Sequence, residues 1–485
     1  MKKNIIKISL AALTVFVSLT SCERNLDQIS SINEDQDQAM TRAESFRQAM
    51  DGAYTALKGG GYYSGDTGSQ LIMGDLTTDN LVRTASGRNT NFAASNFEFS
   101  SDNSQTTGLY NAAYLAISRT NFVLKYINNG VLSGTQKTNI EAEARALRAI
   151  VHFDIVRAYS QIPTQSAGAK SSIGIYYSET YSPLNNTSSR NLTVEQVYDK
   201  IIADLLFAAD NITQNDADKG RLSKAAIYGL LSRVNLYKGD YANTIKYGEL
   251  ALGLSPSVTQ RSNFYAIWKE KEGNVNDGVL FQVSNAAAEQ NTVGAAYNQA
   301  VPSLRSEFVV DYDLYTAYTD NDVRKSAYFT TSIYSKQKYN HVTKYAGNGG
   351  PSNIVPIKYL RSAEVLLNIA EAYYRSGDQA SALTLLNKLR VERYTTFTPG
   401  TEAGQVLLDA ILKERRLELA FENDRWYTLK RLGLPVQRSG KGDLFDGTGS
   451  PAVKQTLDAG NTKWQWPIPI TAIQANPNIK QNENY

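Results

Sequence analysis

Apolar residues recur at helical spacing on both sides of a glycine–aspartate turn in residues 362–393. One series with the spacing i, i+3, i+4 and i+7 starts at Leu366 and a second starts at Ala382, which predicts two amphipathic helices. Between them, Gly377 suits the left-handed end of the first helix, and Asp378 can cap the start of the second. The alternation of small and large apolar residues is typical of a tetratricopeptide hairpin. Because such a hairpin cannot bury its apolar face alone, we expect further helices to pack against it.

The same pattern predicts these further helices. Residues 223–254 repeat the hairpin around Gly239 and Asp240, and residues 407–432 read as one long helix or a pair. Two sequences have the form of a capping box, which places helix starts next to Thr41 and Thr193. The other periodic stretches are residues 43–57, 109–128, 137–159 and 194–208.

Two long segments lack helical period and separate the predicted helices. They are residues 62–107 and 257–356, which are rich in Gly, Ser, Thr, Asn and Asp with scattered aromatic residues. Within the second, residues 279–283 are the best candidate for a β-strand. Long irregular segments in a compact domain are often functional. We therefore expect the helices to form a scaffold and these segments to supply a binding site.

The N-terminus has the pattern of a secretory signal. Residues 1–21 combine lysines at the start with an apolar run too short to span a membrane. The run ends in Leu19-Thr20-Ser21-Cys22, which resembles a bacterial lipobox, and Cys22 is the only cysteine of the chain. We expect a signal peptide over 1–21, lipidation of Cys22, a flexible tether over 22–40, and a single domain over 41–485.

Charge and composition exclude several function classes. The net charge of +3 over 485 residues comes from three lysines in the signal, so the remaining chain carries 47 basic and 47 acidic residues. A neutral chain does not suggest nucleic-acid binding. With two histidines, of which His152 lies inside a predicted helix as a packed or surface residue, a multi-histidine metal site is not expected. No phosphate loop, dinucleotide fingerprint, zinc-protease or serine-hydrolase motif is present, so we predict neither a cofactor nor an enzyme.

A pair of carboxylates on one predicted helix is a candidate catalytic site. Glu414 and Glu418 lie at i and i+4 on one helix face, where two carboxylates can act together. However, Arg415, Arg416 and Arg425 surround them, and such patterns indicate structural ion pairs. We therefore expect the pair to hold the fold rather than to catalyse a reaction.

Several of the motifs together resemble a known family, the SusD/RagB-like outer-membrane lipoproteins of the Bacteroidetes. The lipobox begins the match, and the motif around Glu414–Glu422 with Arg425-Trp426 is its most recognisable part. The other matching stretches are residues 145–163, 322–324, 359–378, 467–469 and 476–482. The resemblance implies a mainly α SusD-like fold, with tetratricopeptide-type hairpins as a scaffold and irregular loops and a few short strands on one side.

The resemblance also implies a function. It suggests a lipid-anchored protein of the outer membrane, facing the cell exterior, that binds a nutrient oligomer and delivers it as a lid to a SusC-like TonB-dependent transporter. A glycan is the first expectation. An oligopeptide ligand, a surface hydrolase and a repeat scaffold without a ligand remain as alternatives.

The irregular segments supply the candidate ligand contacts. Aromatic rings can stack on the C–H faces of sugars while Asn and Asp side chains hydrogen-bond to hydroxyl groups, although each such residue could also serve loop packing. The candidates are Asp75, Asp79, Asn80, Phe92 and Asn96 in the first segment, and Trp268, Tyr297 and Asn298 in the second.

Overall fold

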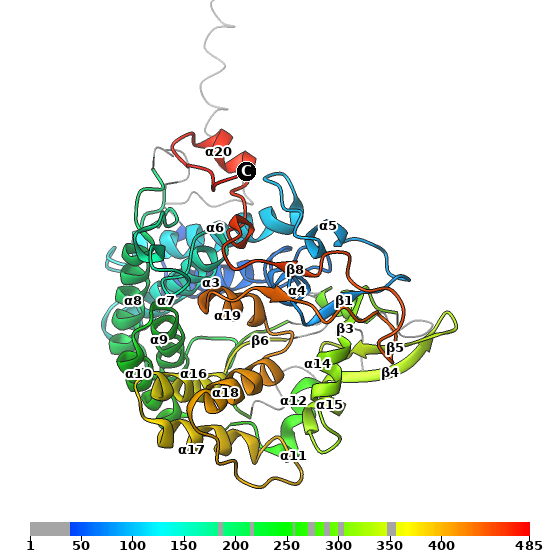
Figure 1. Cartoon of the computed structure of the whole chain (residues 1–485). Helices are drawn as coiled ribbons and strands as arrows, with labels where there is room; N and C mark the ends of the chain where they lie inside the picture. Colours follow the sequence, from blue (N-terminus) through cyan, green and yellow to red (C-terminus); the bar gives the residue numbers. More distant parts are fainter. Residues whose placement is uncertain are drawn as a thin grey trace, which may run out of the picture.

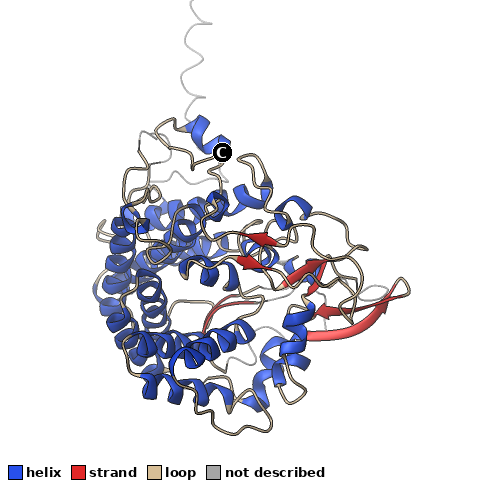
Figure 2. Cartoon of the chain, in the orientation of Figure 1, coloured by secondary structure: helices blue, strands red, loops and turns tan. Residues whose placement is uncertain are grey.

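Helices form one side of the molecule, and short strands with long loops form the other (Figures 1 and 2). The computed structural model describes residues 39–182, 188–213, 218–255, 258–269, 277–285, 292–298, 305–346 and 356–485. The predicted signal peptide, Cys22 and nearly all of the tether lie outside the described residues. The described part has the mainly α fold that the sequence predicts.

Eight long helices pack against one another in a curved series that forms the scaffold. In packing order they are α6 (Ser104–Tyr126), α7 (Gly134–Tyr159), α8 (Val194–Asn211), α9 (Lys224–Lys238), α10 (Tyr241–Leu254), α16 (Ser362–Arg375), α17 (Gln379–Arg390) and α18 (Gly404–Glu418). Helix α3 (Ala43–Ala56) covers α6 and α7. The remaining helices are short: α4 (Gln70–Leu76), α5 (Phe92–Ser95), α11 (Arg261–Phe264), α12 (Ala266–Lys269), α13 (Val293–Tyr297), α14 (Tyr312–Ala317), α15 (Val323–Tyr328), α19 (Arg425–Arg431), α20 (Ile470–Ala475) and the 3₁₀ turns Ala169–Ser171 and Thr462–Trp464.

Both predicted hairpins are confirmed, with the expected turn chemistry. Gly377 has φ +91° after α16, and the Asp378 carboxylate accepts the Ser381 N–H at 3.0 Å at the start of α17. Gly239 has φ +82° in the corresponding turn between α9 and α10. The two hairpins meet where α10 packs on α16. A Cβ at Gly248 would lie 2.5 Å from Ile369, so this contact requires glycine.

Of the two predicted capping boxes, one forms and the other does not. At α8 the Thr193 side chain accepts the N–H of Gln196, and the Gln196 side chain accepts the N–H of Thr193. The prediction at Thr41 is wrong, because α3 starts one residue later and Arg42 takes the N-cap position without a side-chain hydrogen bond. Glu44 then lies at the second helical position, where a capping box cannot close.

The strands form three small antiparallel sheets. The largest has the order β1-β3-β5-β4, and two further pairs are β2-β6 and β7-β8. The strands are β1 (Leu81–Arg83), β2 (Val279–Val283), β3 (Phe308–Val310), β4 (Phe329–Tyr334), β5 (Gln337–Val342), β6 (Ile357–Arg361), β7 (Val436–Gln437) and β8 (Thr456–Leu457). The predicted strand at 279–283 is therefore confirmed as β2. The two segments predicted to be irregular contribute five of these strands, all short.

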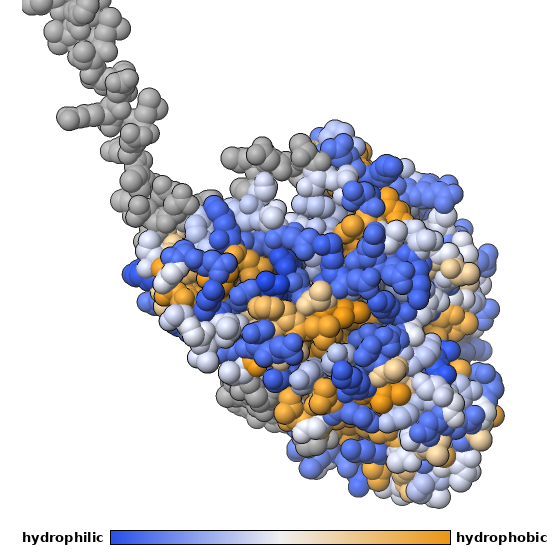
Figure 3. Space-filling view, turned by 90° about the vertical axis from the view of Figure 1, so that its left-hand side faces the viewer, coloured by the Kyte–Doolittle hydropathy of each residue, from blue (hydrophilic) through white to orange (hydrophobic). Residues whose placement is uncertain are grey.

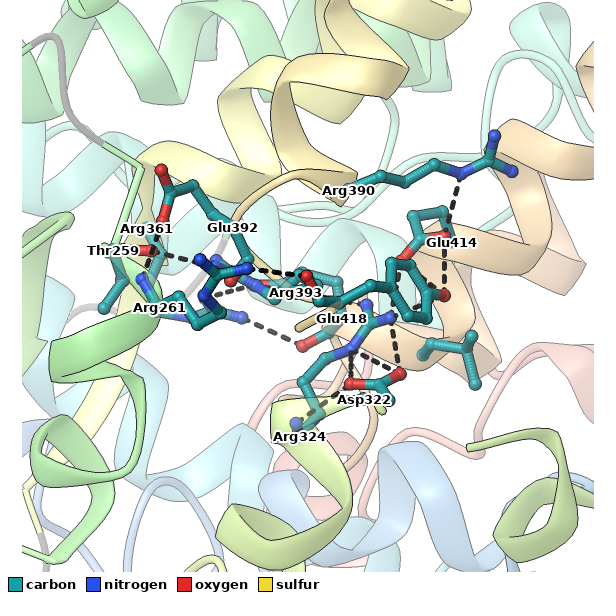
Figure 4. A network of polar contacts seen from close by, with 12 residues as sticks. Thr259, Arg261, Asp322, Arg324, Arg361, Arg390, Glu392, Arg393, Glu414 and Glu418 are labelled. Carbon is teal, nitrogen blue, oxygen red and sulfur yellow. Dashed lines mark hydrogen bonds and ion pairs between the residues drawn. The ribbon is translucent and has the colours of Figure 1, made fainter. Parts of the chain in front are cut away.

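A buried ion-pair network joins the scaffold to the strands (Figure 4). At its centre is Glu418, at the end of α18, whose side chain is fully buried. Its carboxylate accepts hydrogen bonds from Arg361 at 2.7 Å, from Arg393 at 2.8 and 3.0 Å, and from Arg324 at 3.3 Å. Burial alone would raise the pKa of this carboxyl, but Arg393 and Arg361 hold the pKa of Glu418 well below its usual value.

The neighbouring residues extend this network in both directions. Glu414 pairs with Arg324 at 2.6 Å and with Arg390 at 3.3 Å, while Glu422 pairs with Arg361 at 2.6 Å and with Lys344 at 2.7 Å. Both carboxylates of the pair Glu414 and Glu418 are thus buried in ion pairs. This supports their interpretation as structural residues.

We expect Glu418→Gln to lower the free energy of unfolding by about 3–5 kcal/mol, because it leaves three buried guanidinium groups without their shared anion. Urea unfolding followed by circular dichroism measures this loss. The matched control is Glu179→Gln, which removes a half-exposed partner of Lys200 and should cost no more than about 1 kcal/mol. Equal losses in the two variants would contradict a central role for Glu418.

His152 is packed inside α7 and carries no charge. Its Nδ1 donates to the Arg148 carbonyl at 2.9 Å, its Nε2 accepts the Ser178 N–H at 3.0 Å, and its ring stacks on Tyr177 at 3.9 Å. Burial, and secondly the positive charge of Arg148, lower the pKa of His152 to about 3. The imidazole is therefore a neutral bridge between a helix and the following loop.

We predict that the His152 imidazole stays neutral in the folded protein until the pH approaches about 3, whereas the unfolded chain protonates near its ordinary pKa of about 6.5. Because the folded pKa is the lower one, this contribution to stability is present above about pH 6.5 and is lost as the pH falls toward 3. NMR titration of the two imidazoles, in buffer and in concentrated urea, tests this. A folded-state midpoint near 6.5 would contradict it.

Candidate functional site

Three of the predicted ligand contacts in the first irregular segment tie that segment to the helical scaffold. Asp75 accepts the side-chain amide of Asn80 at 2.7 Å and the Phe421 N–H at 3.0 Å. Asp79 forms a two-pronged ion pair with Arg425 at 2.7 and 2.8 Å. All three predicted residues, Asp75, Asp79 and Asn80, are buried. Their side chains therefore hold the loop in place.

The predicted contacts in the second segment lie in a buried aromatic cluster. Trp268 meets Tyr328 edge to face at 5.8 Å and has the Lys344 ammonium 4.2 Å from its ring centre. Tyr297 is fully buried, and Asn298 donates to the Val342 carbonyl at 3.1 Å. The structure thus places these three residues, Trp268, Tyr297 and Asn298, beneath the surface.

Phe92, which is half-buried, and Asn96, which is buried, are the two predicted residues that the structure brings together at a hollow, which we call the Phe92 cleft. One wall comes from α4, β1 and α5, and the other from the loop after β7. The lining residues are Leu76, Leu81, Arg83, Ala85, Phe92, Ser95, Asn96, Arg438, Ser450, Pro451, Ala452 and Val453. The cavity volume is about 100 Å³.

Arg438 joins the two walls of the Phe92 cleft. Its guanidinium donates to the carbonyls of Thr78, Ser95 and Leu76 on one wall, at 2.8 to 3.0 Å. It also donates to the carbonyl of Lys454 on the other wall at 2.6 Å. Four bonds to backbone oxygens fix the separation of the walls, so the cleft is held open by the fold itself.

The cleft combines an aromatic ring, apolar side chains and hydrogen-bonding groups. Phe92 is half-buried and has the Arg83 guanidinium 4.7 Å from its ring centre. Val453 is among the most exposed large apolar residues, and Ser450 and Asn96 add polar groups. None of the lining residues is acidic. This arrangement can bind a ring that has both apolar faces and hydroxyl groups, and its lining offers no pair of carboxylates for acid–base chemistry.

One wall of the Phe92 cleft was not predicted from the sequence. The wall formed by Arg438, Ser450 and Val453 lies outside both predicted ligand-facing segments. A signal for it is present, because residues 440–449 contain four glycines and no helical period, as the two predicted ligand-facing segments do. Arg83 was missed because an arginine at a strand end has no distinctive pattern.

Other hollows also lie on the described surface. A shallow apolar groove on α9 and α10 has a volume of about 840 Å³ and includes Tyr228, Ile245 and Leu250. Figure 3 views this helical side, where apolar patches interrupt a mainly hydrophilic surface. A second hollow of about 370 Å³ adjoins α15 and β4. The Phe92 cleft is the one that contains residues predicted for ligand contact.

None of the described helices is both long enough and apolar enough to cross a lipid bilayer. Among the same residues, no group of three or more histidine, cysteine or acidic side chains is placed to hold a metal ion.

Comparisons with known proteins agree along the whole described chain. Residues 256–485 match the family model described as the SusD family, and residues 30–236 match one described as starch-binding and associating with the outer membrane. SusD-like protein P2 of Formosa agariphila is 25% identical over 90% of this chain and 91% of its own length.

Solved structures show the same fold. A Bacteroides vulgatus protein named as a candidate sugar-binding protein has a TM-score of 0.80 and 25% identity, over 92% of this chain and 99% of its own. Surface glycan-binding protein A of Bacteroides uniformis has a TM-score of 0.69 and 21% identity, over 90% of this chain and 99% of its own. The two matching family models, the similar sequences and the shared fold lead to one conclusion: the chain belongs to the SusD family.

Proposed function

We propose that this chain is a cell-surface lipoprotein that binds a glycan in the Phe92 cleft and delivers it, as a lid, to a SusC-like TonB-dependent transporter of the outer membrane. The proposal is supported mainly by a preformed cleft in a chain of the SusD family. The cleft combines an aromatic ring, apolar side chains and polar side chains that can hydrogen-bond to sugar hydroxyl groups. The names of its relatives support sugar binding, and one family description supports association with the outer membrane.

Binding in the Phe92 cleft rests on two kinds of contact. The apolar C–H faces of a sugar would pack against Phe92 and Val453, while Ser450 and Asn96 would meet its hydroxyl groups. The cavity of about 100 Å³ is smaller than the roughly 300–1,000 Å³ of typical small-molecule sites, so a single ring would enter and the rest of an oligomer would lie across the mouth. The eight predicted contacts then divide into Phe92 and Asn96 at the ligand and six residues that support the loops around it.

The lid role requires attachment to the membrane and to the transporter. Lipid on Cys22 would supply the attachment to the membrane, with residues 22–40 as the tether between the membrane and the folded domain.

An oligopeptide is the second candidate for the ligand in the same lid role, because an aromatic ring beside polar groups also suits a peptide side chain.

We expect Phe92→Ala to weaken binding of the preferred oligosaccharide by about tenfold, or ~1.4 kcal/mol, through the loss of ring stacking. Isothermal titration after a screen of oligosaccharides and oligopeptides measures this. The matched control is Phe207→Ala on α8, where a half-buried phenylalanine also has an arginine over its ring, at 4.0 Å, far from the cleft in the chain. Binding of oligopeptides alone would favour the second candidate, and equal losses in both variants would remove Phe92 from the site.

Purification of the chain from outer membranes in mild detergent should recover a TonB-dependent transporter in a defined ratio, with acyl chains on Cys22 detected by mass spectrometry. The control is Cys22→Ala, which should release the chain from the membrane fraction while leaving oligosaccharide affinity unchanged. If the wild-type chain is recovered without a transporter, the lid role is wrong even where the glycan affinity is confirmed.

A further inference from the structure

Strand β4 forms a free edge of the four-stranded sheet. It is the last strand in the order β1-β3-β5-β4 and pairs with β5 along its whole length, from Phe329 opposite Val342 to Tyr334 opposite Gln337. Figure 1 shows this β4–β5 hairpin extending from the body of the molecule. The Phe329 N–H bonds to the Lys325 carbonyl of α15, and no other backbone hydrogen bond from a described segment outside the β4–β5 hairpin reaches residues 329–334. Every second residue of an edge strand turns its N–H and C=O groups outward, so β4 offers unpaired groups along its length.

The sequence of β4 lacks the features that normally protect such an edge. Edge strands are usually blocked by a charged residue, a proline or a bulge, because an open edge can pair with another chain. Strand β4 reads Phe-Thr-Thr-Ser-Ile-Tyr, without a charge or a proline, and its pairing with β5 contains no bulge. Ile333 near the tip is 63% exposed. An unprotected edge with an exposed isoleucine is a surface suited to a partner strand.

The charged side chains at the tip of this hairpin are positive, whereas those at its base are already paired, Lys325 with Asp320 at 2.7 Å and Arg324 with Asp322 at 2.8 Å. Residues 323–346 contain five basic residues and no acidic residue. Lys336 and Lys338 are both exposed, and neither forms an ion pair with another described residue. Ile333 lies directly opposite Lys338, so the two side chains share one face of the hairpin. A strand added next to Ile333 would therefore meet positive charge.

A hollow beside β4 could receive side chains of an added strand. Phe329 and Thr331, two residues apart and hence on one face of β4, line this hollow of about 370 Å³. Its other lining residues include Tyr315, Lys325 and the acidic Asp320 and Asp322, so apolar or hydroxyl side chains of an added strand fit it better than acidic ones. Pockets for alternate side chains next to an open edge are the arrangement by which strand addition gains specificity.

We propose that the free edge of β4 accepts an extended acidic segment of another polypeptide as a fifth strand of the sheet. The backbone of β4 supplies the pairing groups, Ile333 supplies apolar contact, and Lys336 and Lys338 select for acidic side chains. Pairing of β4 with β4 of a second copy is disfavoured, because it would bring two basic hairpins side by side. This polypeptide site is separate from the Phe92 cleft and does not depend on what that cleft binds.

Hydrogen–deuterium exchange of the full folded chain tests the proposal, with the blocked peptide Ac-Glu-Val-Glu-Val-Glu-Val-Glu-NH₂ as the probe. We expect the acidic peptide to slow exchange of outward amides in 329–334 by about tenfold, since the added strand pairs them. The lysine analogue of the same length should give no protection. Equal protection by both peptides, or none by either, would overturn the proposal. If protection of residues 329–334 increases with protein concentration in the absence of peptide, the edge pairs with a second copy of the chain. That result would also overturn the proposal.

Two pairs of variants separate the edge from general effects on the fold. Ile333→Asp should abolish the protection, whereas Val406→Asp, at a position that is also 63% exposed but lies on α18, should not. The double variant Lys336→Glu/Lys338→Glu should lose binding of the acidic peptide and gain binding of the lysine peptide. The control double variant Lys388→Glu/Lys413→Glu changes the same charges at exposed positions of α17 and α18 and should behave as the wild type. Loss of protection in both controls would overturn the assignment to β4.

Discussion

The fold depends on the buried carboxylate of Glu418 and the three arginines that share it. Arg324 comes from α15, Arg361 from the end of β6 and Arg393 from the turn after α17, so one anion joins three segments that are distant in the sequence. A buried anion is costly to desolvate, and its cost is offset only when every oxygen has good partners. Both carboxylate oxygens of Glu418 accept hydrogen bonds from arginine side chains. The helical hairpins and the strand region can therefore meet in one arrangement only, the one that brings these guanidinium groups together.

The stretch from Glu414 to Arg425, which contains Glu418, also positions the loops that form the Phe92 cleft. Arg416 donates to the side chain of Asn80 at 2.8 Å, and Arg425 holds Asp79. The Phe421 N–H, two residues after Leu419, donates to Asp75, where burial raises the carboxyl pKa to about 7. The chain reverses here, with positive φ at Phe421 and Asn423, which exposes backbone groups for these contacts. One short stretch of the chain thus links the buried ion pairs to the first irregular segment.

The sequence predicted most of the helical scaffold, because helical periodicity and Gly-Asp turns are local signals that the packing of α9, α10, α16 and α17 then preserves. It also predicted that Glu414 and Glu418 are structural. Ligand contacts were harder to predict because Asp75 and Trp268 have the composition of a sugar site but lie beneath the surface. Whether a polar residue of an irregular segment faces solvent or a buried arginine depends on partners more than 300 residues away, as with Asp79 and Arg425. The second wall of the cleft did have a local signal, the glycine-rich residues 440–449, but that this loop faces Phe92 depends on contacts between segments far apart in the sequence.

These differences suggest how a single scaffold can serve different ligands. The charged residues that fix the fold, such as Glu414, Arg415 and Glu418, are buried in ion pairs, so substitution there is strongly destabilising. The residues at the mouth of the Phe92 cleft, such as Val453 and Ser450, are exposed and contribute little to the core. Arg438 holds the two walls through backbone carbonyls only, so the side chains on both walls can change without breaking its hydrogen bonds. The side chains of the proposed ligand site can therefore change while the buried ion pairs, and the scaffold that they hold, stay the same.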